Sequence, residues 1–130
     1  MNFLFISIEA LSIDLAWQLQ KEGHQVKFFT QNQNEKDVGD GFVENVDAWE
    51  PLKDWATVIV FDDIGFGDVA EKLRAEGRLV VGGSAYTDKL ENDREFGQEE
   101  LRGVGVNTLP SWNFASFDEA IEFVKKKVSK

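Results

Sequence analysis

The sequence predicts a single α/β domain in which helices flank an open parallel sheet. Short apolar runs rich in β-branched residues alternate with stretches whose apolar residues recur every three or four positions. The chain has 130 residues, enough for one compact domain with a single core. Because strands that alternate with helices pair in parallel, we expect the third strand at one edge, followed by the second, first, fourth and fifth.

The first part of the chain forms a strand–helix–strand unit. Phe3–Ile8 is continuously apolar, as expected for a central parallel strand that is buried on both faces. An apolar helical stripe follows over residues 11–19 and ends at Gly23, and Val26–Phe29 forms the second strand. No basic residue precedes the first strand, and Glu9 interrupts the apolar run, so we interpret it as a strand and not as a signal peptide.

The middle of the chain contains shorter elements. Residues 31–40 are polar and lack a period, which predicts a surface loop. Phe42–Val46 is expected to be a short edge strand, and residues 51–55 a brief helix opened by a proline. Thr57–Phe61 is a further β-branched strand, and a helical stripe then runs to a glycine over residues 69–77.

The last third begins with a strand at Leu79–Gly82, and Gly82-Gly83 allow a tight turn before Ser84. Apolar residues at helical spacing predict one charged amphipathic helix over residues 90–104. Ser116 and Glu119 form a capping-box pattern before a second amphipathic helix. Lysines gather at its end, where cations suit the helix dipole, namely Lys125, Lys126, Lys127 and Lys130.

Composition excludes several classes of function. The formal net charge of −10 disfavours nucleic-acid and anionic-membrane partners. The chain has no cysteine, which excludes disulfides, thiol catalysis and cysteine-type zinc sites, and is consistent with a cytoplasmic location. With 42% hydrophobic residues, the chain has enough apolar side chains for a packed interior.

Four motifs carry a resemblance to a known family. Lys72–Ser84 contains a helix that ends at a glycine, followed by a strand and a small-residue turn, and Leu90–Phe96 is similar to the pattern L-E-x-[SD]-[KR]-x-F. Gly105–Pro110 is similar to a G-I-x-x-P strand, and Phe117–Ala120 closes the series. From Ala56 onward the chain therefore resembles the first domain of phosphoribosylamine–glycine ligase (glycinamide ribonucleotide synthetase) and related ATP-grasp ligases.

The resemblance implies a Rossmann-like pre-ATP-grasp domain that spans residues 1–130. It implies a parent enzyme of purine biosynthesis that joins an amine to a carboxylate through an acyl phosphate, using ATP and Mg. The nucleotide-binding ATP-grasp domain would be a partner, in the same parent chain or as a separate subunit. We expect no catalytic residue, cofactor or metal in this chain, and no catalysis by it alone. The charged residues Glu91, Asp93 and Arg94 would lie at the interdomain contact, and otherwise form a solvated face.

A small-molecule substrate site is expected at the carboxyl ends of the strands, where open parallel sheets bind ligands. In the resembled family a glycine-rich turn after the first strand helps to hold the phosphoribosyl group. Here Ser7–Ser12 contains no glycine, and Glu9 adds negative charge. We therefore expect a substrate other than phosphoribosylamine, with an amine or a positive charge, or no ligand. The expected substrate-binding residues are Glu9, Ala10, Asp62, Asp63, Gly82, Gly83 and Ser84.

Other interpretations remain open from the residues alone. Asp62 and Asp63 suit a cation site or a helix N-terminus, which leaves a response-regulator-like domain possible, although Glu9 stands alone after the first strand. A dinucleotide-binding domain would need G-x-G-x-x-G, which is absent there. His24 is interpreted as a polar turn residue, because the chain has no second histidine to share a metal. A non-enzymatic interaction domain is the remaining alternative.

Overall fold

The computed structural model describes residues 1–128, so Lys130 of the predicted lysine group lies outside the described residues. The chain forms two compact units, Met1–Gly97 and Gln98–Lys130, which we call the first and second units. Within residues 1–128, no helix has the length and apolar character needed to cross a membrane.

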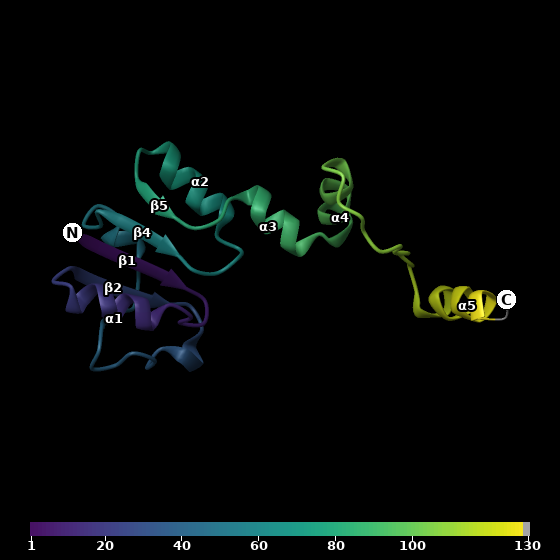
Figure 1. Ribbon diagram of the computed structural model, residues 1–130. Coiled ribbons are helices and arrows are strands. Elements are labelled where there is room, and N and C mark those ends of the chain that lie inside the picture. The colour runs from purple at the N-terminus through teal and green to yellow at the C-terminus, as the bar shows by residue number, and fades with distance from the viewer. Residues whose placement is uncertain (129–130) are drawn as a thin grey trace. The chain divides into compact units, whose positions relative to one another are not determined.

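The first unit is built on a five-stranded parallel sheet (Figure 1). The strands run in the order β3-β2-β1-β4-β5, which confirms the predicted arrangement. Central β1 pairs along its whole length with β2, from Asn2 opposite Gln25 to Ser7 opposite Thr30. The strands are β1 (Asn2–Ser7), β2 (Gln25–Thr30), β3 (Glu44–Val46), β4 (Val58–Phe61) and β5 (Leu79–Val81).

Helices cover both faces of this sheet, because β1 and β4 carry apolar side chains on each side. On one face Phe5 and Phe28 are fully buried and pack with Ala16 of α1. On the other face Ile6 and Ile59 pack with α2. Figure 1 shows α1 beside β2 and α2 beside β5. The helical segments of the first unit are α1 (Ile13–Lys21), η1 (Gln33–Glu35), η2 (Glu50–Leu52), α2 (Gly67–Ala75) and α3 (Ala85–Asn92).

The predicted single helix over residues 90–104 is wrong, because the chain forms two helices there. The first is α3, and the second is α4 (Arg94–Gly103). Asp93 separates them with φ −110° and ψ 94°, and its Oδ1 accepts a hydrogen bond from the Phe96 amide at 3.0 Å. A short carboxylate that accepts from an amide three residues later satisfies the start of a new helix and so favours the break.

The second unit contains α5 (Phe117–Val128), against which an irregular segment packs. Trp112 and Phe114 lie against Phe123, with ring centroids 5.2 and 5.1 Å apart, and the Lys127 ammonium is 3.4 Å from the Trp112 ring centroid. The predicted strand at Gly105–Pro110 does not form within the described chain. The described part of this unit offers no other strand to pair with it, and a lone strand leaves its backbone groups unsatisfied.

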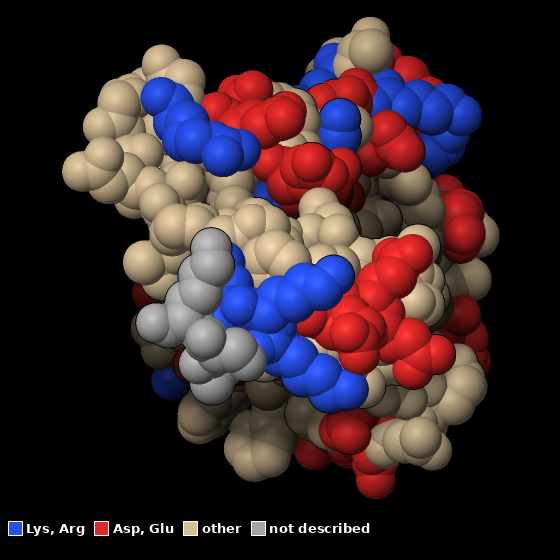
Figure 2. Space-filling model, turned by 90° about the vertical axis from the view of Figure 1, so that its right-hand side faces the viewer, with Lys and Arg blue, Asp and Glu red and all other residues tan. Residues whose placement is uncertain are grey.

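The predicted cap of α5 forms with a small difference. Ser116 Oγ accepts a hydrogen bond from the Glu119 amide at 3.3 Å, whereas Glu119 Oε2 accepts from the Ala115 amide at 3.1 Å. At the other end of α5, Lys125 pairs with Glu122 at 3.0 Å. Glu122 thus provides an acidic neighbour on the same helix, and Figure 2 shows Asp and Glu side chains beside Lys and Arg side chains in its view.

Candidate functional site

The turn between β1 and α1 (residues 8–12) forms the centre of the candidate site at the carboxyl edge of the sheet. It lies beside the end of β4, because β1 and β4 are neighbouring parallel strands. Ala10 is buried and has a φ of 56°, the left-handed conformation that glycine usually supplies. Ala10 therefore adopts the left-handed conformation of this turn, although the turn contains no glycine.

Asp63, which follows β4, is the main support of the β1–α1 turn. Its Oδ2 accepts a hydrogen bond from the Ile8 amide at 2.6 Å and another from the Ser7 hydroxyl at 3.1 Å. The Glu9 amide makes a longer contact of 3.4 Å with the same oxygen. Two amides of the turn and the hydroxyl at the end of β1 thus converge on one carboxylate oxygen, and hydrogen bonds to an ionised acceptor are among the stronger ones in proteins.

Asp62 supports the other end of the same turn. Its Oδ2 accepts from the Ser12 amide at 2.9 Å and from the Ser12 hydroxyl. Ser12 precedes α1, but its side chain makes no capping bond to the helix, because its hydroxyl donates to Asp62 instead. Asp62 Oδ1 is buried without a hydrogen-bond partner, as is the hydroxyl of Thr30 at the end of β2.

The structure corrects one interpretation of the acidic pair. The sequence allows Asp62 and Asp63 to cap the helix that follows them, but in the structure both reach across to the end of β1 and the start of α1. The first amide of α2, that of Gly67, instead donates to Asp88 Oδ2 at 2.7 Å. Both carboxylates therefore use Oδ2 to hold the turn, whereas the response-regulator alternative would use the pair to hold a cation.

The turn between β5 and α3 (residues 82–84) is held by an arginine that the sequence analysis did not single out. The Arg74 guanidinium donates to the carbonyls of Gly82 and Gly83, both at 2.8 Å. A capping box with Thr87 fixes Ser84. A Cβ on Gly82 would lie 2.9 Å from the Cβ of Phe61, so glycine permits this close approach to β4.

The structure therefore places the predicted site residues in two turns at the carboxyl edge of the sheet, after the strands on either side of β4. Glu9, Ala10, Asp62 and Asp63 meet at the β1–α1 turn, where the exposed Glu9 side chain adds to the negative charge. Sequence reasoning missed Ser7, Ser12 and Arg74, whose roles depend on contacts between residues far apart in the chain. The predicted interdomain residues lie exposed around the break between α3 and α4, namely Glu91, Asp93 and Arg94.

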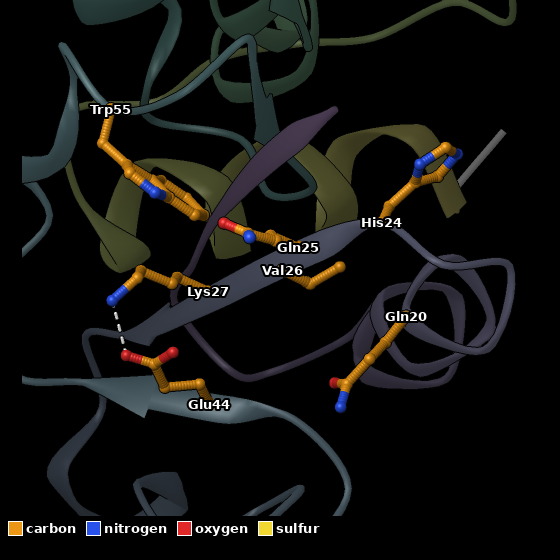
Figure 3. A pocket seen from close by; sticks show the side chains of 7 residues that line it. All are labelled: Gln20, His24, Gln25, Val26, Lys27, Glu44 and Trp55. Carbon is orange, nitrogen blue, oxygen red and sulfur yellow. Dashed lines mark hydrogen bonds and ion pairs between the residues drawn. The ribbon is translucent and has the colours of Figure 1, made fainter.

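A separate hollow lies at the opposite, amino-terminal edge of β2 and β3 (Figure 3). Lys27 pairs there with Glu44 at 2.5 Å and lies 5.3 Å from the Trp55 ring centroid. His24 lines this hollow, with its ring 5.2 Å from that of Phe3, and so does not contribute to the β1–α1 turn. Its position next to a strand start agrees with its interpretation as a polar turn residue.

The fold and the two turns define a Rossmann-like α/β domain with its candidate site at the carboxyl edge of a parallel sheet. Its fold is similar to that of N5-carboxyaminoimidazole ribonucleotide synthetase from Thermotoga maritima, with a TM-score of 0.67 and 18% identity over 94% of this chain. It is also similar to N5-carboxyaminoimidazole synthetase from Staphylococcus aureus complexed with ADP, with a TM-score of 0.64 and 19% identity over 94% of this chain.

These similarities show the fold, and the chain spans 36% of the length of each synthetase. No protein-family model and no curated protein matches the sequence.

Proposed function

We propose that this chain is the amino-terminal domain of an ATP-grasp carboxylate–amine ligase. The observation that carries the proposal is the fold similarity, which extends over 94% of this chain but only 36% of each ribonucleotide synthetase. The motifs similar to those of phosphoribosylamine–glycine ligase point to the same class of enzyme. A ligase of purine biosynthesis is the function that both observations support.

In this proposal the domain contributes part of the substrate site, and the chemistry belongs to its partner. The β1–α1 and β5–α3 turns lie at the edge where open parallel sheets bind ligands. The ATP-grasp domain would bind ATP and Mg and form the acyl phosphate. Glu9, Asp62 and Asp63 would face the amine-bearing part of the substrate, because an ammonium group is attracted to carboxylates.

The second unit supports a protein partner. Its large apolar side chains are exposed to an unusual degree: Phe117 is 89% exposed, Leu109 80% and Val104 78%. Apolar side chains exposed together in such numbers mark surfaces that another protein covers. We propose that the ATP-grasp domain covers them, and that Gly105–Pro110 gains its strand pairing there.

Reconstitution tests this function. The chain is mixed with the ATP-grasp domain encoded downstream in the same reading frame or in a neighbouring gene, and ADP release is measured with candidate amines and carboxylates. We expect ADP release that depends on amine, carboxylate and both proteins. The proposal fails when neither location encodes an ATP-grasp domain, or when the mixture consumes no ATP with any amine–carboxylate pair.

A further inference from the structure

We propose that Asp63 permanently fills the anion position of the β1–α1 turn and so makes this turn reject phosphate. The inference deepens the proposed function, since it concerns which part of a substrate the domain accepts. It makes Asp63 a specificity-determining residue. The part of the ligand that reaches this turn is then neutral or positively charged.

The geometry around Asp63 Oδ2 is that of an anion cradle. Successive backbone amides that point to one place, together with a hydroxyl, are the donors with which proteins hold phosphate oxygens. Here the donors are the Ile8 amide, the Ser7 hydroxyl and the more distant Glu9 amide, at 2.6, 3.1 and 3.4 Å. The acceptor that they surround belongs to the protein itself.

Two further amides of the turn are also engaged. The Leu11 amide donates to Ser7 Oγ at 3.3 Å, and the Ser12 amide donates to Asp62 at 2.9 Å. A phosphate group would therefore have to displace Asp63, and it would then lie near Asp62 and Glu9. Both the loss of hydrogen bonds and the repulsion between like charges oppose its entry.

Titration of the intact chain with inorganic phosphate and with ribose 5-phosphate tests this inference by amide NMR shifts. For the wild-type chain we expect no saturable shift of the Ile8, Glu9 and Ser12 amides at sub-millimolar ligand. Replacement of the carboxylate in Asp63→Ala frees the cradle. We expect saturable shifts at these amides, with phosphate affinity raised about tenfold or more, and a Tm that rises with phosphate concentration.

Glu9→Gln is the matched control, because it removes one negative charge from the same turn but leaves Asp63 in place. We expect its phosphate affinity to stay close to that of the wild type. Equal gains in Glu9→Gln and Asp63→Ala would show that net charge, and not occupation of the cradle, sets the preference. That result would overturn the inference, as would an Asp63→Ala chain that folds and gains no affinity.

Circular dichroism establishes whether the Asp63→Ala chain is folded. If that variant is unfolded, Asp63→Ser is used in its place. The wild-type titration decides independently of either variant, since sub-millimolar phosphate binding at the turn amides contradicts the inference. None of these measurements needs ATP or an ATP-grasp domain. A failed reconstitution therefore leaves this inference standing, and phosphate binding by the wild-type turn leaves the ligase proposal standing.

Discussion

At the scale of single residues, the two turns of the candidate site are held by side chains from distant parts of the chain. These side chains replace the hydrogen bonds that a turn usually makes within itself. The β1–α1 turn depends on two aspartates that follow β4, and the β5–α3 turn depends on Arg74 of α2. Each of these side chains links a turn to a segment that follows β4 in the sequence. Loss of any of them should loosen the candidate site while the apolar core stays packed.

Arg74→Lys tests this dependence at the β5–α3 turn. Lysine keeps the charge but cannot donate in a fork to the carbonyls of Gly82 and Gly83. We expect the free energy of unfolding to fall by about 1–2 kcal/mol, measured by urea denaturation. Arg102→Lys makes the same change at an exposed position of α4. Its free energy of unfolding should stay within about 0.5 kcal/mol of the wild-type value. Equal effects of the two substitutions would refute the role given to Arg74.

At the scale of elements, the sequence predicts the regular parts of the fold better than their boundaries. The predicted strands coincide with all five strands of the described sheet. The apolar runs are most continuous in β1 and β4, because strands buried on both faces need apolar residues at every position. The apolar residues at helical spacing over residues 90–104 do not predict the break at Asp93. Such spacing carries no information about a side chain that caps a new helix. A strand-like pattern such as Gly105–Pro110 does not report whether a partner strand exists.

The sequence also does not predict the contacts that Asp62 and Asp63 make with the β1–α1 turn. The strand order predicts that Glu9 and the pair Asp62-Asp63 lie at one edge. It does not predict that the carboxylates accept from turn amides 55 and 50 positions away, because that depends on the path of the turn. The left-handed Ala10 could not be foreseen either, since alanine rarely adopts that conformation.

The break between α3 and α4 gives a prediction at this scale. Asp93→Ala removes the acceptor of the Phe96 amide, and we expect it to destabilise the start of α4 by about 1 kcal/mol. Amide hydrogen exchange at Phe96 and Gly97 measures the change. Asp93→Asn keeps an acceptor oxygen and should show a much smaller increase in exchange. Unchanged exchange in Asp93→Ala would mean that the cap does not hold the break.

At the scale of the whole molecule, the first unit has a buried core and the second unit exposes most of its apolar side chains. This difference suggests that a partner protein covers the exposed apolar side chains of the second unit. The first unit also offers little to a nucleotide phosphate, because the sequence has no glycine-rich phosphate loop and the Ile8 and Ser12 amides of the β1–α1 turn are engaged.

We therefore expect the isolated chain to bind ATP negligibly and to form no ligase product. Calorimetry with ATP and Mg measures the first point, and product analysis with candidate amines and carboxylates the second. The complex with the proposed ATP-grasp domain serves as the positive control. Micromolar ATP binding by the isolated chain would contradict the assignment of nucleotide binding to the partner.

The exposed apolar side chains of the second unit give the last prediction. Phe117 is 89% exposed, so Phe117→Ser should change the free energy of unfolding of the isolated chain by no more than about 0.5 kcal/mol. The same substitution should weaken association with the ATP-grasp domain by about tenfold or more, because a buried aromatic side chain at an interface commonly contributes over 1 kcal/mol. Calorimetric titration of one protein with the other measures this change.

Phe123→Ser is the contrasting variant, since Phe123 packs against Trp112 and Phe114 inside the second unit. It should disturb that packing in the isolated chain, which the fluorescence of the tryptophans reports. Phe117→Ser should leave the fluorescence unchanged. If Phe117→Ser binds the ATP-grasp domain as tightly as the wild type, Phe117 lies outside the interface. The partner would then have to cover the unit from a side that includes neither Phe117 nor the start of α5.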